Sequence, residues 1–276
     1  MFVLFAAMAF ELFTQGKIPA PYWGNDSLYG GDEIGFDPKG HFAPVFAFDG
    51  PGRLQKRLFN ICDGEKAQFW ITMFFWVRAD GAEVLPPGIV HQCGSTDQNG
   101  VTVLTAEMLY TMFDGPMPDN WIVHATVSGY ADQLFFEKML AQLINARLGR
   151  TKPCCVLVDG HDSHLYADAI KRAAAVGVYV FFLKSHDSIR DQISDNGPNA
   201  IVHAVYSRAI AALRRKTQDT VAMSISLFNS AVVRAWNEAV TSIPMAACKA
   251  AQACGWYYDI DKRYTRRQAS HATHDC

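Results

Sequence analysis

The stretch from Cys154 to Asn199 most constrains the fold, because it alternates short apolar runs with an amphipathic segment. It reads CCVLVDGHDSHLYADAIKRAAAVGVYVFFLKSHDSIRDQISDNGPN. The apolar runs at 154–158 and 178–184 are typical of strands buried on both faces, and the segment between them has helical spacing and ends at Gly177. A strand, a helix and a second strand predict a parallel pair joined by a right-handed crossover. We therefore expect an α/β fold.

An aspartate stands near each end of this stretch. Asp159 is the first polar residue after a buried strand, and Asp195 comes just before Pro198 and a long helix. Chemistry in an open α/β sheet collects at the carboxyl ends of parallel strands, where the chain leaves the sheet. Each aspartate also has a simpler interpretation. Asp159 can be a turn residue bonded to its own loop, and Asp195 can cap the helix that follows.

A second pair of carboxylates lies upstream, in LYGGDEIGFDPKG. If this segment is a strand, Asp32 and Glu33 face opposite ways, so only one of them can point into a common site. The alternative is an exposed acidic turn. Residues 58–91 have a β pattern, in which QFWITMFFWVRADG predicts a central strand and EVLPPGIVHQ its antiparallel neighbour, joined by a turn at 79–82.

The remainder is mostly helical. We expect an irregular connection over 92–120 and a helix over 131–148, where apolar residues recur at helical spacing. Three more helices are predicted from IVHAVYSRAIAALRRK, SISLFNSAVVRAWNEAV and PMAACKAAQAC. The first carries basic residues off its apolar stripe, and such a face is either solvated surface or a contact for nucleic acid.

Composition limits the classes of protein that these elements can form. Half of the 276 residues are hydrophobic, so the chain can bury a large core, and the net charge of −2 restricts any nucleic-acid surface to a local patch. Seven cysteines without metal-ligand spacing favour a reducing intracellular compartment. The apolar start, Met1 to Phe10, is too short for a membrane span and lacks a basic n-region, so we expect no membrane association.

The order of these segments resembles the DDE superfamily endonucleases of pogo, Tigger and jerky type transposases. The resemblance covers about residues 25–260 and is carried by GGDEIGF, FWITMFFWVRADGAEVLPPGIVHQ, VHATVSGYADQLFFEKML, VLVDGHDSHL, FFLKSHDSIRDQISDNGPNA and AACKAAQACGWYYDI. Two positions depart from the family pattern. Ile34 stands where the family has threonine, and Ser194 stands where it has an apolar residue before the third acid.

The resemblance implies an RNase H-like mixed sheet flanked by helices, with a helical C-terminal extension. It implies an N-terminal apolar or irregular segment at 1–24, a catalytic domain at 25–220, the extension at 221–260 and a polar tail at 261–276. Because Asp32 lies close to the start of the chain, the helix-turn-helix region of such transposases has no room here. We therefore expect an isolated catalytic domain, either truncated or domesticated.

The resemblance also implies the site. Asp32, Asp159 and Asp195 would be the catalytic acids and the metal ligands. Three converging carboxylates without a counter-charge raise one another's pKa, so divalent cations belong among them, and Mg²⁺ or Mn²⁺, two ions per site, suits carboxylate and phosphate oxygens. The candidates for supporting these acids or contacting phosphate are His161, His164 and Gln192. The candidates for contacting the DNA backbone are Lys184, Arg208, Arg214 and Arg215.

Three hypotheses follow. The first is a metal-dependent DNA endonuclease or transposase domain that cleaves phosphodiester bonds by a two-metal mechanism, acts in the nucleus or elsewhere in the cell, and is compatible with an oligomer. The second is an inactive, domesticated descendant that binds nucleic acid or a protein partner. The third is an unrelated metallohydrolase in which Asp159, His161, Asp162 and His164 hold the ions within one loop.

Overall fold

The computed structural model describes residues 25–37, 45–48, 54–57, 70–92, 118–150, 153–183, 192–217 and 225–256. The strands are β1 (Leu28–Phe36), β2 (Val45–Phe48), β3 (Leu54–Arg57), β4 (Ile71–Arg78), β5 (Gly88–Gln92), β6 (Ile122–Thr126), β7 (Cys154–Asp159) and β8 (Val178–Leu183). The helices are α3 (Gln133–Ala146), α4 (Ala167–Ala175), α6 (Pro198–Thr217), α7 (Ile225–Ala239) and α8 (Ile243–Ala253), with short 3-10 turns η1 (Asn25–Ser27) and η2 (Asp162–His164). The expectations for 1–24, 58–62, 93–117, Lys184 and 261–276 fall outside the described residues.

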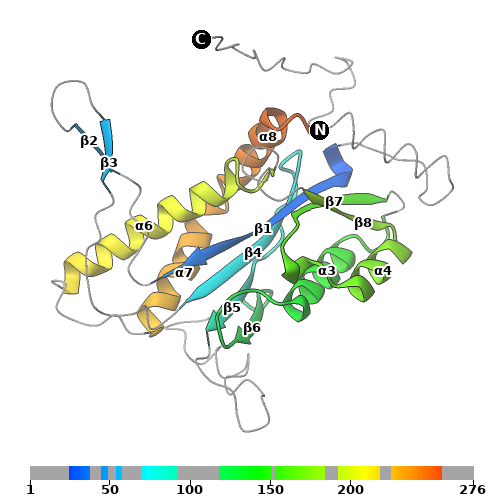
Figure 1. Cartoon of the computed structure of the whole chain (residues 1–276), viewed down its shortest axis with the longest axis horizontal. Coiled ribbons are helices and arrows are strands. Elements are labelled where there is room, and N and C mark those ends of the chain that lie inside the picture. Colours follow the sequence, from blue (N-terminus) through cyan, green and yellow to red (C-terminus); the bar gives the residue numbers. More distant parts are fainter. Residues whose placement is uncertain are drawn as a thin grey trace, which may run out of the picture.

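Six strands form one mixed sheet in the order β6-β5-β4-β1-β7-β8, which Figure 1 shows nearly face on. β1 pairs antiparallel with β4, and β4 pairs antiparallel with β5. On the other side of β1, β7 and then β8 add in parallel. The predicted hairpin and the predicted parallel pair are both confirmed. The antiparallel strands β5, β4 and β1, followed by the parallel strands β7 and β8, make this an RNase H-like sheet, as expected.

The aromatic run of β4 and the glycines of β1 explain why these two strands lie at the centre. Every residue of β4 except Arg78 is buried, as predicted for a strand covered on both faces. A Cβ built on Gly31 of β1 would come within 2.3 Å of the Trp76 ring, so only glycine lets that indole cross the neighbouring strand. The Trp76 Nε1 donates to the Met139 carbonyl at 2.8 Å and ties the sheet to α3.

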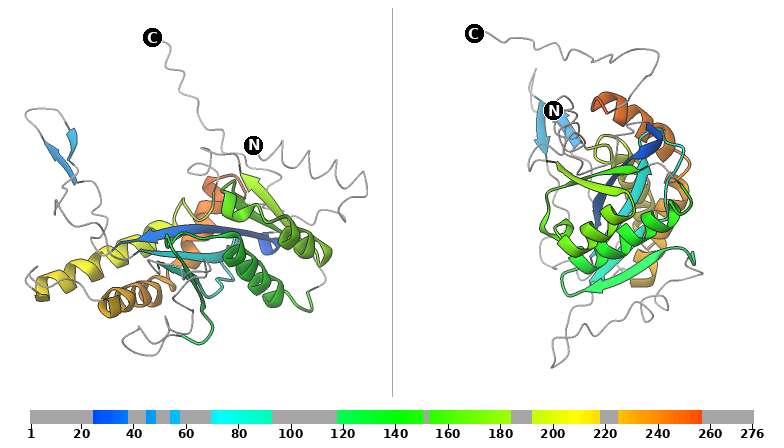
Figure 2. Two further views of the ribbon diagram at one scale, coloured as in Figure 1. Left: turned by 60° about the horizontal axis from the view of Figure 1, so that its bottom comes forward. Right: turned by 90° about the vertical axis from the view of Figure 1, so that its right-hand side faces the viewer.

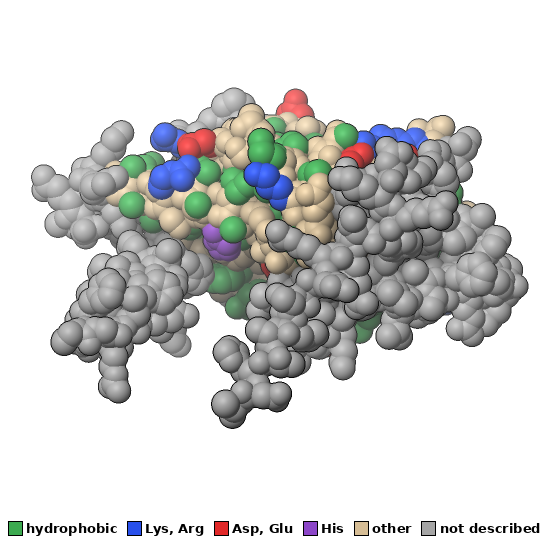
Figure 3. All heavy atoms as spheres, turned by 90° about the horizontal axis from the view of Figure 1, so that it is seen from above, with side chains coloured by type: hydrophobic (Ala, Val, Ile, Leu, Met, Phe, Trp, Pro, Cys, Tyr) green, Lys and Arg blue, Asp and Glu red, His purple; other side chains and the backbone are tan. Residues whose placement is uncertain are grey.

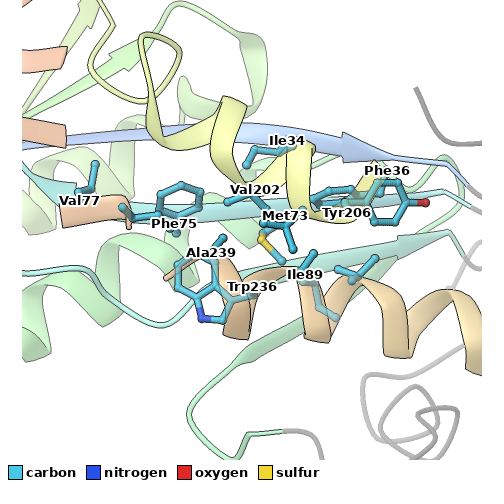
Figure 4. Packing of buried hydrophobic residues seen from close by; sticks show 14 of the residues in the cluster. Ile34, Phe36, Met73, Phe75, Val77, Ile89, Val202, Tyr206, Trp236 and Ala239 are labelled. Atoms are coloured by element: carbon cyan, nitrogen blue, oxygen red, sulfur yellow. The ribbon is translucent and has the colours of Figure 1, made fainter. Parts of the chain in front are cut away.

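Side-chain alternation divides the core into two layers. The face that carries Ile34 and Phe75 packs against α6, α7 and α8, as Figure 4 shows at close range with Val202 and Trp236. The other face, which carries Phe74, packs against α3 and α4. Figure 2 shows α3 beside α4, and α6 beside α7, from two further directions. The predicted C-terminal extension therefore contributes to the same core as the sheet.

One strand was missed by sequence reasoning. WIVHATVSGY was expected only to lead into the helix, but Ile122–Thr126 forms β6 and pairs in parallel with β5 at the edge of the sheet. Its burial alternates, so it has fewer apolar residues than the central strands and a weaker signal. Among the described residues, no helix is both long and apolar enough to span a bilayer.

Asp132 caps the helix that follows this strand. Its carboxylate accepts from the Phe135 amide at 2.8 Å and lies 3.0 Å from His124 Nε2. Burial acts to raise the pKa of Asp132, but His124 and the Phe135 amide outweigh burial and lower it. Its folded-state pKa is thus below its unfolded value.

We expect Asp132→Ala to lower the free energy of unfolding by about 1 kcal/mol at pH 7, because α3 loses its cap. A depressed folded pKa stabilises the fold above the unfolded pKa of about 3.9, and that contribution is lost as pH falls through the folded pKa. The difference between the two proteins should therefore shrink below about pH 4. Urea unfolding at pH 7 and pH 3 measures it.

Asp168→Ala is the matched control, because Asp168 is an exposed first-turn carboxylate of α4 that makes no capping hydrogen bond. Its loss should change stability by less than about 0.5 kcal/mol. An equal loss of stability in both variants would contradict the capping role of Asp132.

Candidate active site

The register between two neighbouring strands aligns the first two expected acids. Leu28 of β1 lies opposite Cys155 of β7, and Gly30 lies opposite Leu157. Continuing this register by two residues sets Asp32 opposite Asp159, on strands that are about 4.8 Å apart where they pair. Leu28, Cys155 and Leu157 all face the α6 layer, and alternation gives Asp32 and Asp159 the same starting direction. At the end of β7, however, the Asp159 carboxylate turns to His164, which packs on the α3 side of the sheet.

The third expected acid lies on a turn that is anchored to β1. Gln192 Nε2 donates to the Gly31 carbonyl at 3.1 Å, and Asn196 Nδ2 closes the turn on the Gln192 carbonyl at 2.7 Å. Because α6 begins at Pro198, Asp195 stands outside the cap position, and the simpler interpretation of Asp195 as a helix cap is wrong. The turn instead places Asp195 beside Asp32, the strand residue that follows Gly31.

Asn199 joins two of the acids. Its Nδ2 donates to Asp32 Oδ2 at 2.9 Å and to Asp195 Oδ1 at 3.2 Å. Sequence reasoning missed Asn199. The available signal was its position four residues after Asp195 in the first turn of a helix, which puts both side chains on one side of that turn. The Asn199 Oδ1 is buried and has no hydrogen-bond partner among the described residues.

Asp32 has the most perturbed environment of the three acids. It is 8% exposed and lies on β1, so the alternative interpretation of an exposed acidic turn is wrong. Burial, then the adjacent Asp195 carboxylate and the more distant Asp159, raise the pKa of Asp32 well above its usual range. Within the described part of the chain, neither Asp32 nor Asp195 pairs with a lysine or arginine. The raised pKa means that Asp32 takes up a proton more readily than an ordinary aspartate, and no basic side chain among the described residues is there to favour its ionised form.

The Asp159 carboxylate is held by a buried histidine. His164 Nδ1 lies 2.7 Å from Asp159 Oδ1, and His164 Nε2 lies 3.3 Å from Glu33 Oε1. Burial would raise the pKa of Asp159, but His164 outweighs burial and lowers it. Burial would lower the pKa of His164, but the two carboxylates outweigh burial and raise it to about 10. His164 is therefore an imidazolium at neutral pH.

The three residues expected to support the acids differ in exposure. Gln192 and His164 are fully buried, which favours support of the acids over direct contact with phosphate. His161 is exposed, and its Nδ1 lies 2.9 Å from Ser163 Oγ. The His164 ring is buried, with Nδ1 engaged by Asp159 and Nε2 facing Glu33 at 3.3 Å without a hydrogen bond among the described residues, so the ring is directed to these two carboxylates. This geometry speaks against the third hypothesis.

The donor set around Asp32 suits a hard cation. Asp32 and Asp195 supply carboxylate oxygens, which meet at the Asn199 Nδ2. Asp195 is exposed, which opens this cluster to solvent. The Asp159 carboxylate is engaged with His164. In the described residues, no three His, Cys, Asp or Glu side chains are gathered closely enough to hold a metal ion as they stand.

The basic residues expected to contact DNA are only partly described. Arg208 is exposed on α6 and pairs with Glu238 at 3.0 Å. Arg214 and Arg215 fall within α6, but their side chains lie outside the described residues, as does all of Lys184. On the face seen in Figure 3, the described basic and acidic side chains lie near one another, so the described part of that face carries charges of both signs.

No family model and no curated protein matches this sequence. Distant similarity is found to solved structures of Mos1 mariner transposase. The Mos1 transposase paired-end complex with left transposon end is 10% identical, with a TM-score of 0.40, over 92% of this chain and 61% of that one. The paired end complex with Mn is 11% identical, with a TM-score of 0.37, over 92% of this chain and 61% of that one. The catalytic domain is 11% identical, with a TM-score of 0.34, over 92% of this chain and 91% of that one. The chain thus spans under two thirds of the protein in these complexes.

Proposed function

We propose that this chain is the catalytic domain of a metal-dependent DNA endonuclease of the DDE type, derived from a transposase. The observation that carries the proposal is the convergence of Asp32 and Asp195 on one buried asparagine. The neighbouring strand β7, which pairs in parallel with β1, ends at Asp159. Carboxylates concentrated in this way, without a basic partner among the described residues, favour a divalent cation as the missing counter-charge.

Each residue has a distinct role in this proposal. Asp32, Asp159 and Asp195 are the acids that would hold two Mg²⁺ or Mn²⁺ ions. Asn199 keeps Asp32 and Asp195 together, and Gln192 anchors the turn that carries Asp195 to β1. Bound divalent cations would activate a water or a DNA 3′-hydroxyl and stabilise the leaving oxygen of a phosphodiester.

The side chains themselves prepare the site for that chemistry. Sheet strands and a short anchored turn carry the acids, so their positions are fixed before a ligand arrives, which lowers the cost of reaching a reactive geometry. Asp195 is exposed and Asp32 is buried, so one side of the site is open to solvent and the other is not. A phosphate can approach from the Asp195 side, while packing holds Asp32 in place.

The proposal predicts that the purified protein nicks supercoiled plasmid DNA with Mg²⁺ or Mn²⁺ and loses this activity completely in excess EDTA. The reason is that, in this proposal, the acids act by holding the cations that would activate water and stabilise the leaving oxygen. Agarose-gel separation of supercoiled and open-circular plasmid measures the rate. Nicking that persists in EDTA would contradict the proposal, and restoration by added Mg²⁺ after EDTA treatment is the control.

A second candidate function is a catalytically inactive, domesticated domain that binds nucleic acid or a protein partner. The contact between Asp159 and His164 favours it, because that carboxylate is already neutralised by an imidazolium. The absence of nicking with either metal, together with DNA binding in a gel-shift assay, would support this alternative over the first. DNA is the proposed partner of the active domain, and nucleic acid or a protein is that of the inactive one. The proposed location in both cases is the nucleus or another intracellular compartment.

A further inference from the structure

We propose that Glu33 is a positioning residue that ties the loop carrying the second acid to the strand carrying the first. This inference rests on the proposed function, because it concerns how Asp159 is held relative to Asp32. The loop in question is the β7–α4 loop, residues 160–166, which follows Asp159 directly. Nothing in the sequence pattern assigned Glu33 any role beyond its place next to an acid.

Strand alternation gives Glu33 its direction. Asp32 and Glu33 are consecutive residues of β1, so when Asp32 points to the α6 layer, Glu33 points to the opposite face, where α3 and the β7–α4 loop lie. The Glu33 side chain is 22% exposed and lies beside that loop. A carboxylate fixed to the same strand as Asp32, one residue on, is therefore available to hold the loop.

Two contacts make the connection. Ser163 Oγ donates to Glu33 Oε1 at 3.1 Å, and His164 Nε2 lies 3.3 Å from the same oxygen. Ser163 and His164 are consecutive residues of η2, and both are buried. A single carboxylate oxygen thus engages two neighbouring side chains of the loop, which fixes the turn more firmly than one contact between long side chains would.

The fixed η2 turn orients Asp159, the second acid. His164 uses its other ring nitrogen to contact Asp159 Oδ1 at 2.7 Å, and Phe136 of α3 packs against the ring at 4.6 Å between centroids. The polar chain therefore runs from β1 through Glu33, His164 and Asp159 back to β7. Partners of this kind, one step removed from the acids, commonly decide ligand orientation.

We test the inference with Glu33→Ala, which removes both contacts, and Glu33→Gln, whose amide oxygen can still accept from Ser163 and face His164. Hydrogen exchange of the β7–α4 loop in the metal-free protein is the first measurement, since the His164 amide bonds to the His161 carbonyl at 2.9 Å. We expect about tenfold faster exchange in Glu33→Ala and nearly unchanged exchange in Glu33→Gln.

Mn²⁺ affinity, measured by electron paramagnetic resonance of the free ion, is the second measurement. We expect about tenfold weaker binding in Glu33→Ala, because the Asp159 carboxylate loses its fixed direction, and binding within about threefold of the wild type in Glu33→Gln. Glu137→Ala is the matched control, since the ion pair of this α3 carboxylate is with Arg172 of α4 and not with Ser163 or His164. It should leave both measurements unchanged.

The outcomes separate this inference from the proposed function. Unchanged loop exchange in Glu33→Ala would overturn the positioning role of Glu33. A Glu33→Gln protein as impaired as Glu33→Ala would also overturn it, because the effect would then come from the lost charge and not from the two contacts. A wild-type protein that binds no Mn²⁺ would overturn the metal-dependent function, while the exchange result still decides the positioning role of Glu33. If Glu33→Ala fails to fold, Ser163→Ala removes one of the two contacts and should show an intermediate increase in loop exchange.

Discussion

Asp159→Asn is expected to lower the rate of metal-dependent DNA nicking by about 1000-fold, the loss that follows removal of one essential electrostatic group from an active site. Asparagine has nearly the volume of aspartate, and its Oδ1 can still accept from His164 Nδ1, so the fold should be retained. What disappears is the negative charge that would hold a cation between β1 and β7. Single-turnover nicking rates and far-UV circular dichroism measure the two effects separately.

Asp119→Asn is the matched control for this comparison, because Asp119 is an exposed carboxylate on the turn before β6. Its nicking rate should equal that of the wild type. Equal nicking by the wild type and Asp159→Asn would remove Asp159 from the catalytic site and with it the assignment of all three acids. The absence of nicking in both proteins would support the domesticated alternative.

Asp32→Asn is expected to stabilise the metal-free protein. Its free energy of unfolding should rise by about 2 kcal/mol at pH 7, or its Tm by about 4 to 8 °C. The Asp32 carboxyl is buried beside Asp195, and its raised pKa means that the fold is less stable at pH 7 than it would be with an ordinary or neutral group at this position. Asparagine at position 32 would still accept from Asn199 and could donate to Asp195 without this cost. Thermal unfolding in EDTA measures the change.

The same substitution should abolish nicking, because a residue that destabilises the fold is retained for its chemistry. Adding Mg²⁺ should raise the Tm of the wild type but leave the Tm of Asp32→Asn unchanged. Asp168→Asn, on the surface of α4, should show no gain in stability under either condition. A metal-free Asp32→Asn protein that is less stable than the wild type would contradict the idea that Asp32 is held at an energetic cost.

Much of the fold could be predicted from local pattern. Apolar runs bounded by polar residues predicted β4, β7 and β8 as strands, and β4 and β7 are buried on both faces as expected. The expectation of burial on both faces is wrong for β8, because β8 is an edge strand in which only Val178 and Leu183 are buried. The turn at Gly81, with a φ of 73°, and the stop at Gly177, with a φ of 81°, followed from the positive φ that glycine adopts readily. β6 was missed because its alternating burial leaves only a few apolar residues as a signal.

The residue pattern by itself marked Asp159 and Asp195, which stand where a buried strand or a helix meets polar chain, and left Asp32 and Glu33 as alternatives. The family resemblance then implied Asp32 as the first acid. Only the tertiary structure decided what surrounds them. The pairing of Asp32 and Asp195 through Asn199 depends on a turn that Gln192 fastens to β1. The physical reason is that local periodicity reports which face a residue takes, whereas the partner it meets there is set by strand register and by turns that join distant parts of the chain.

Glu33 illustrates the difference most directly. Alternation along β1 established from sequence that Asp32 and Glu33 point to opposite faces. That rule places Glu33 on the face opposite Asp32. It could not reveal that Glu33 contacts Ser163 and His164 there, more than a hundred residues later in the chain. Contacts of such long separation arise only when β7 docks in parallel beside β1, and no local pattern in either segment encodes them.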